Sequence, residues 1–187
     1  MDFANATALD SRRLAALLLR HTAPYRHDDM VVRVRYSRGA DFSGSCHYQR
    51  HLIYVNLGRH VTYPYALATH VARARGNRAY WWRELYVLTV ADAYQLVLFV
   101  YLHELYHYLL KQSGRGLRQR EAMCDRFAAG VLVDEHAASL KTRQGRPVSR
   151  KSWDFQDLRG FVAAAPRSPP AVAATRAIPV TIRGRES

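Results

Sequence analysis

The sequence predicts a single α+β domain in which a short β-sheet packs on two helices. Residues 30–36 alternate in the way that a half-buried strand does, and residues 51–57 (HLIYVNL) are predicted to form a second strand, which Gly58 ends. Residues 84–112 are apolar on nearly every side, which predicts a long buried helix. Of the 187 residues, 49% are apolar, so the chain can bury the core that such a domain requires.

The first half of the chain contains most of the predicted strands. Leucines spaced along one face predict an amphipathic helix over residues 10–20. The strand over 30–36 places valines on one side and arginines on the other. A turn over 37–45, which contains two glycines, separates it from the strand over 51–57. Beyond that second strand, residues 66–75 are predicted to be helical.

The second half is predicted to be helical up to about residue 140. Glycines end the long helix after residue 112, and a second helix is predicted over 117–140. Five of the seven prolines lie at or beyond Pro147, which marks a change of composition. We therefore predict a domain over residues 1–140, followed by a largely disordered tail over 141–187, rich in Pro, Arg and Ala, in which 152–162 form a short helix.

The formal net charge of +13 points to polyanionic partners. Residues 141–187 hold ten basic and three acidic residues, so about half of the excess lies in the predicted tail. A second basic cluster, Arg73–Arg83, contains Tyr80 and two tryptophans. The tail and this cluster are candidate nucleic-acid surfaces. The alternative for the cluster is that Trp81 and Trp82 lie in the core, within a rim of solvated arginines.

The cysteine count and hydropathy predict the cellular compartment. Cys46 and Cys124 are too few for a disulfide framework, and we expect both to be reduced and structural. The N-terminal sequence has no signal-peptide pattern. The most apolar stretch, residues 93–102, is too short to span a bilayer. The sequence thus predicts a soluble, cytoplasmic protein with no membrane partner.

The motif with the clearest chemical meaning is H-E-x-x-H at residues 103–107. On a helix, His103 and His107 lie one turn apart on one face, where both imidazoles can bind one zinc ion. Glu104 projects about 100° away and can act on a water at the metal without being a ligand. The alternative is a pair of core histidines beside a salt-bridged glutamate. Burying these groups in an apolar helix is costly unless something satisfies them, which favours a metal.

A catalytic zinc needs a third protein ligand, and the following helix offers Glu121. If the two helices are antiparallel, Glu121 lies opposite the histidine pair. Asp125, one turn further along, can accept the N–H of a ligand imidazole and fix its tautomer. His136 is the alternative third ligand, although it lies about four turns beyond Glu121.

These two segments resemble a known family. His103–His107 followed by Glu121–Ala128 (EAMCDRFA) is similar to the active helices of ImmA/IrrE-type zinc peptidases, whose second helix reads E-x-x-A-D-x-F-A. Leu52–Asn56 resembles the I-x-V-N strand that precedes their active helix. The resemblance covers residues 30–133 and implies a minigluzincin-like fold and a zinc-dependent metalloendopeptidase, with two histidines and the downstream glutamate as ligands. SprT-like proteases share only the first half of the motif.

The residues of the motif predict a mechanism, and the resemblance implies a substrate class. Glu104 would be the general base for hydrolysis of a protein or peptide, including regulatory proteins bound to DNA. The edge of strand 51–57 is the expected site for an extended peptide. The alternative function is a nucleic-acid-associated regulatory module that has a zinc site but no proteolytic activity. Four side chains remain unranked as donors to the oxyanion: Tyr101, Tyr106, Tyr108 and His136.

Overall fold

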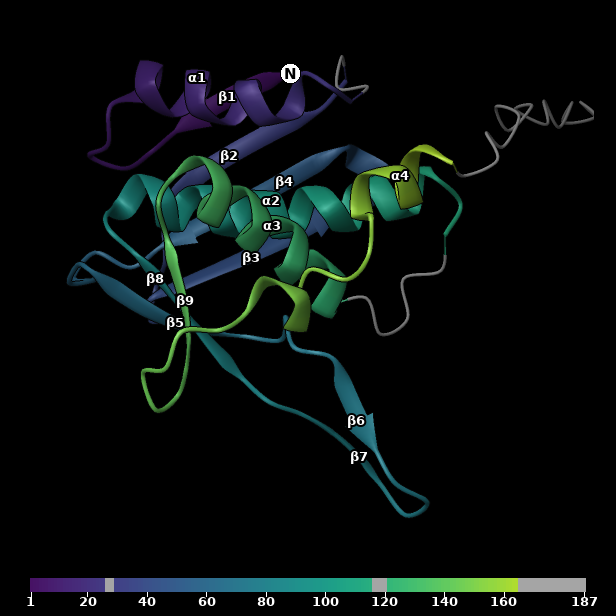
Figure 1. Cartoon of the computed structure of the whole chain (residues 1–187). Helices are drawn as coiled ribbons and strands as arrows, with labels where there is room; N and C mark the ends of the chain where they lie inside the picture. Colours follow the sequence, from purple (N-terminus) through teal and green to yellow (C-terminus); the bar gives the residue numbers. More distant parts are fainter. Residues whose placement is uncertain (26–28, 116–120, 165–187) are drawn as a thin grey trace, which may run out of the picture.

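The computed structural model describes residues 1–25, 29–115 and 121–164, and these residues form a mixed α and β fold (Figure 1). Within the described part there are four α-helices and three small sheets. None of the described helices is long and apolar enough to cross a bilayer. The helices are α1 (Ser11–Thr22), α2 (Ala93–Gln112), α3 (Glu121–Glu135) and α4 (Leu158–Ala163).

The largest sheet has the strand order β1-β2-β4-β3. β1, β2 and β4 are parallel, and β3 runs antiparallel to β4 at one edge. One face of β2 and β4 is buried through Val32, Val34, Ile53 and Val55; α2 packs against β3 and β4, and α1 lies beside α2 (Figure 1). The strands are β1 (Asp2–Asn5), β2 (Val31–Tyr36), β3 (Phe42–His47) and β4 (Leu52–Leu57).

Two smaller sheets complete the described fold. The first is antiparallel, in the order β5-β8-β9, and comprises β5 (Tyr65–Thr69), β8 (Tyr86–Val90) and β9 (Ser139–Thr142). The second is a hairpin of β6 (Ala74–Gly76) and β7 (Trp81–Arg83), which projects from the body of the molecule (Figure 1). Trp81 and Trp82 are exposed there, so the interpretation that they belong to the core is wrong.

The predicted α+β class is confirmed, and several of its elements are found. The helix predicted over 10–20 is α1, and the strands predicted over 30–36 and 51–57 are β2 and β4. Asp10 caps α1 by accepting a hydrogen bond from the backbone N–H of Arg13.

Three predicted elements in the first half of the chain are wrong. The helix predicted over 66–75 is strand β5 followed by the start of the hairpin, because β5 pairs with β8 along its length. The long helix begins at Ala93 and not at 84: alternate residues of β8 are buried, and Asp92 caps α2. The predicted turn over 37–45 overlaps β3, which is held as a strand by its pairing with β4.

The domain continues past the predicted boundary at residue 140. The helix predicted over 117–140 is α3, which ends at Glu135, and the chain then forms β9 against β8. Trp153 and Leu158 are buried in the core, and α4 overlaps the predicted helix over 152–162. The prediction of a tail beginning at 141 therefore fails for residues 141–164. The expectation of disorder over 165–187 lies outside the described residues.

Candidate metal centre

Helix α2 positions the two histidines of the H-E-x-x-H motif. It is buried on most sides, and His103 and His107 lie on its partly exposed face, toward α3. Their rings are 4.9 Å apart between centroids. Glu121 is the first residue of α3, and because α3 packs along α2 its side chain reaches both histidines.

The donor atoms of these three residues converge. The Nε2 atoms of His103 and His107 are 3.2 Å apart. The two carboxylate oxygens of Glu121 lie 3.1 Å from Nε2 of His103 and 3.2 Å from Nε2 of His107. Two donors bound at about 2.0–2.2 Å to one tetrahedral zinc lie about 3.3–3.5 Å apart. The described side chains therefore fit the zinc site that the sequence predicts.

Asp125 supports the histidine pair from the second turn of α3. Its Oδ1 lies 2.8 Å from Nδ1 of His103, which leaves Nε2 of that ring free to bind a metal. Its Oδ2 accepts a hydrogen bond of 2.6 Å from the backbone N–H of His70, and the His70 ring lies 3.3 Å from the same oxygen. This buried carboxylate thus fixes the orientation of His103. His107 differs, since its buried Nδ1 has no hydrogen-bond partner among the described residues.

The side chain of Glu104 lies against strand β3, on the helix face next to that of the histidines. A Cβ atom placed on Gly44 would lie 2.7 Å from Cγ and 2.9 Å from Cδ of Glu104, so the carboxylate occupies the space that this glycine leaves. Burial raises the pKa of Glu104 to about 7, and the neighbouring His103 opposes that rise. A carboxyl group with such a pKa can accept and return a proton near neutral pH.

Cys124 is a further donor near the histidines that sequence reasoning assigned only a structural role. Its Sγ lies within 4.8 Å of donor nitrogens of His103 and His107. Burial raises the pKa of the thiol, and nearby carboxylates raise it further. The carboxylate oxygens of Glu121 lie 3.1 and 3.2 Å from Nε2 of the two histidines, so the geometry favours Glu121 as the third donor, with Cys124 as the alternative.

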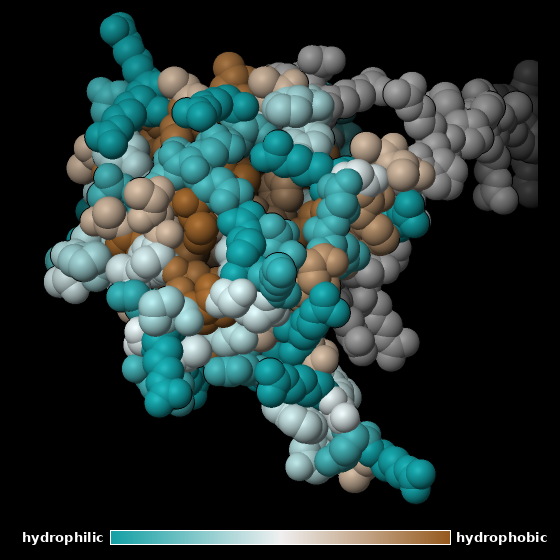
Figure 2. Space-filling view, viewed as in Figure 1, coloured by the Kyte–Doolittle hydropathy of each residue, from teal (hydrophilic) through white to brown (hydrophobic). Residues whose placement is uncertain are grey.

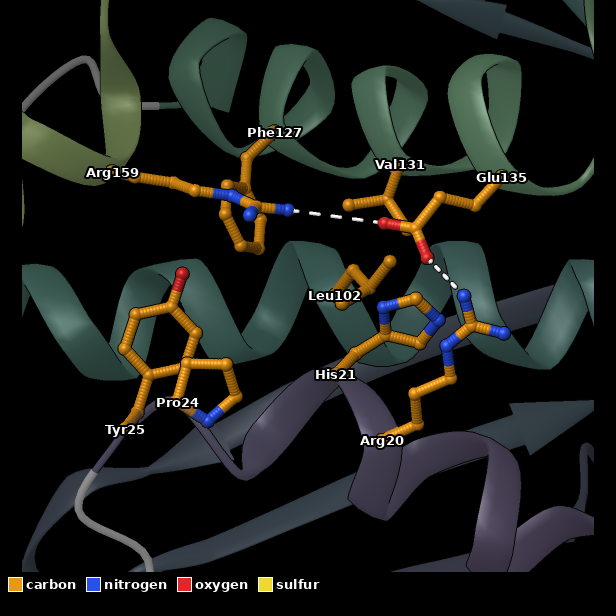
Figure 3. Close-up of a pocket in the computed structure, with 9 residues that line it drawn as sticks. All are labelled: Arg20, His21, Pro24, Tyr25, Leu102, Phe127, Val131, Glu135 and Arg159. Carbon is orange, nitrogen blue, oxygen red and sulfur yellow. Dashed lines mark hydrogen bonds and ion pairs between the residues drawn. The ribbon is translucent and has the colours of Figure 1, made fainter.

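A second group of possible metal donors, His21, Glu135 and His136, lies at the other end of α3. The Nε2 atoms of the two histidines are 3.2 Å apart. Arg20 and Arg159 each pair with a carboxylate oxygen of Glu135, as Figure 3 shows. The two N···O distances are 2.8 and 4.0 Å, and the three side chains line a cavity of about 100 Å³. Two guanidinium groups disfavour a cation there. His136 therefore lies beside His21 and is not grouped with His103 and His107, so it is not the third ligand of their site.

The four unranked oxyanion donors all have other partners. The hydroxyl of Tyr101 hydrogen-bonds with Thr22, and that of Tyr106 donates to the carbonyl of Leu158. Tyr108 bonds with the ring of His51, and His136 bonds with His21.

Tyr48, which sequence reasoning missed, is a tyrosine whose pKa responds to the carboxylates of the site. Burial raises its pKa to about 12, and the charges of Glu104 and Glu121 contribute to that rise. Its phenol is therefore protonated at neutral pH and is able to donate. The only sequence signal for Tyr48 is its position directly after β3, and β3 itself was not predicted.

We expect zinc affinity to rise with pH, because zinc must displace a proton from His103. Burial lowers the pKa of His103, but hydrogen bonds to Asp125 and Glu121 outweigh burial and raise it to about 9. Below that pH the proton competes with the metal, so affinity should increase by up to about tenfold per pH unit and level off above it. Titration calorimetry near neutral pH, in two buffers of different ionisation enthalpy, should show release of about one proton per zinc. A pH-independent affinity would contradict this assignment.

Comparisons of the chain with models of protein families, with curated proteins and with solved structures find no match. The chemistry assigned to the site therefore rests on the residues of this chain and on their geometry.

Proposed function

We propose that the chain is a zinc-dependent metalloendopeptidase of the ImmA/IrrE type. The supporting observation is the convergence of His103, His107 and Glu121 around one point, with Glu104 on the adjacent face of the same helix. A purely structural zinc site has no need of a carboxyl group with a raised pKa beside it.

Zinc bound by the three ligands would supply a Lewis acid that acidifies water and polarises a peptide carbonyl. Glu104 accepts the proton of the attacking water and then delivers it to the leaving amine. Asp125 holds the tautomer of His103 throughout.

Strand β3 is the proposed place for the substrate backbone. The expectation that the edge of residues 51–57 binds the peptide is wrong, because β4 is paired with β2 on one side and with β3 on the other. Within the described residues β3 pairs only with β4, so its outer edge can add an extended peptide as a further strand. Gly44 of β3 contacts Glu104, so such a peptide would pass the general base. We propose a regulatory protein, including one bound to DNA, as the substrate.

The contact between Gly44 and Glu104 provides a test that leaves the ligands untouched. Gly44→Ala places a methyl group where the carboxylate lies, so Glu104 must move. We expect hydrolysis to fall by on the order of a hundredfold while zinc content is unchanged, since a displaced base loses its alignment. Gly39→Ala is the matched control, because a Cβ there meets nothing within 4 Å. Equal activity of the two variants would contradict the assigned position of Glu104.

The general test of the function combines metal analysis with hydrolysis. The purified full chain should contain one zinc per molecule and cleave members of a fluorogenic peptide mixture. A chelator should abolish cleavage, and added zinc should restore it. A chain that binds zinc but cleaves neither these peptides nor candidate DNA-bound regulators would contradict the proposal and favour the regulatory module.

A further inference from the structure

The hairpin formed by residues 73–83, here called the aromatic hairpin, exposes large aromatic side chains. Tyr80, Trp81 and Trp82 are 62%, 68% and 44% exposed. Apart from Leu19, they are the large hydrophobic residues that the described part of the chain leaves exposed. In Figure 2 the hairpin stands apart from the body, with pale and teal surfaces where aromatic and charged side chains lie. Three exposed aromatic rings on one projection indicate a binding surface.

The aromatic hairpin is ordered without burying these rings. At its turn, the side-chain oxygen of Asn77 accepts hydrogen bonds from the backbone N–H groups of Ala79 and Tyr80, each 2.9 Å long. At its base, Arg83 donates to the carbonyl of His70 at 3.1 Å, and the guanidinium of Arg73 lies 3.8 Å from the ring centre of Phe155. The rings are therefore presented on a pre-organised support, which lowers the entropic cost of binding.

The aromatic side chains occupy both faces of the hairpin. Trp82 pairs across the strands with Arg75, so the two lie on one face, and the ring of Tyr80 is 5.5 Å from that of Trp82. Trp81 lies on the opposite face, where its partner is Gly76. Because glycine has no side chain, the indole of Trp81 is left uncovered.

The charge of the hairpin is entirely positive. Residues 73–83 include four arginines and no acidic residue. Arg73 and Arg83 are used at the base. Arg75 and Arg78 are exposed and form no ion pair with the described carboxylates. The occupant of this surface must therefore be anionic and must offer flat faces to the rings.

We propose that the aromatic hairpin binds single-stranded nucleic acid. Unpaired bases stack on Trp81 and on the pair formed by Tyr80 and Trp82, while Arg75 and Arg78 bind phosphates. Duplex bases already stack on one another and offer no free face to these rings. A lipid surface fits less well, because Arg78 lies in the turn itself, ahead of the aromatic rings, where insertion would place its charge in hydrocarbon. This binding is independent of the proposed peptidase activity.

Tryptophan fluorescence of the full chain tests the proposal directly. Of the three tryptophans, Trp153 is buried and the other two belong to the hairpin. A deoxythymidine oligonucleotide of about 15 nucleotides should quench their emission, and a labelled copy should bind by anisotropy. Trp81→Ala with Trp82→Ala should weaken binding by on the order of a hundredfold, about tenfold for each lost stack. Emission from Trp153 shows whether this variant is folded.

The contribution of the arginines is measured by salt dependence. Arg75→Ala with Arg78→Ala should lower the slope of log affinity against log salt by about 2. Arg12→Ala with Arg143→Ala removes the same charge from exposed positions elsewhere and should change the slope less. Both double variants are measured in the full chain, so the other basic residues contribute equally to each comparison.

Three results would overturn the proposal. The first is unchanged oligonucleotide affinity in the double tryptophan variant. The second is equally tight binding of a duplex of the same length. The third is a shift in emission with phosphatidylglycerol vesicles but not with the oligonucleotide. Glu104→Gln should bind the oligonucleotide with the affinity of the parent. Loss of oligonucleotide binding can therefore be distinguished from loss of peptide hydrolysis.

Discussion

Glu104→Gln is expected to lower peptide hydrolysis by several orders of magnitude while zinc binding and folding are retained. Glutamine keeps the size of glutamate but cannot accept a proton from water. The Glu104 carboxyl group is half-buried beside Gly44 and does not bond to His103, His107 or Glu121. Its replacement therefore leaves the ligands in place. The measurement is the kcat/KM of the parent and the variant on the same cleaved peptide, with zinc content determined for both.

Glu104→Gln also decides between the enzyme and a zinc-containing regulatory module. Equal cleavage by the parent and the variant would show that Glu104 is not the base. Loss of zinc from the variant would show that Glu104 contributes to the metal site, contrary to its position toward β3. Unchanged melting temperature in the zinc-loaded state would show that the loss of activity has a chemical cause.

His107→Ala is expected to abolish stoichiometric zinc binding. It removes one of three donors that lie 3.1–3.2 Å apart and leaves the contact between Asp125 and His103 in place. Since zinc binds the folded state, added zinc should raise the melting temperature of the parent, and this response should disappear in the variant. His60→Ala, which removes an exposed histidine elsewhere, is the control and should respond like the parent.

Two further ligand variants should differ from His107→Ala in informative ways. His103→Ala also leaves Oδ1 of the buried Asp125 carboxylate without its hydrogen-bond partner, so we expect it to destabilise the fold by about 1–3 kcal/mol as well. Glu121→Ala removes an exposed carboxylate and should weaken zinc binding with little effect on the metal-free fold. Undiminished zinc affinity in Glu121→Ala would move the third ligand to Cys124.

The convergence of His103, His107 and Glu121 could be predicted because helical spacing is local information. Positions 103 and 107 face the same way on any helix, and a short connection brings Glu121 back to them. The error at the start of α2 has a physical cause: β8 and α2 are both apolar, and the hydrophobic pattern does not separate a buried strand from a buried helix. Asp92, which caps α2, was the signal that would have placed the boundary.

Strand β3 and its role could not be predicted, because its sequence, FSGSCH, contains no β-branched residue and includes the glycine and serines that are typical of turns. It is a strand because β4 pairs with it, which is a contact between elements and not a local preference. Gly44 and Tyr48 were missed for the same reason. The sequence also did not decide whether Trp81 and Trp82 are buried or exposed, since composition alone does not distinguish a core tryptophan from one on a projecting hairpin.

The carboxylate of Asp125 joins two parts of the molecule that have different proposed ligands. One oxygen orients His103, and the other holds the backbone of His70, whose carbonyl accepts the bond from Arg83 at the base of the aromatic hairpin. A ligand that displaces the backbone of His70 would also displace the Asp125 carboxylate, which fixes the orientation of the His103 ring. Thermodynamic reciprocity then requires that the factor by which an oligonucleotide changes zinc affinity equal the factor by which zinc changes oligonucleotide affinity. The two factors are measured in separate titrations. If both factors equal one, binding at one region has no effect on affinity at the other, and Asp125 only holds the two regions in place.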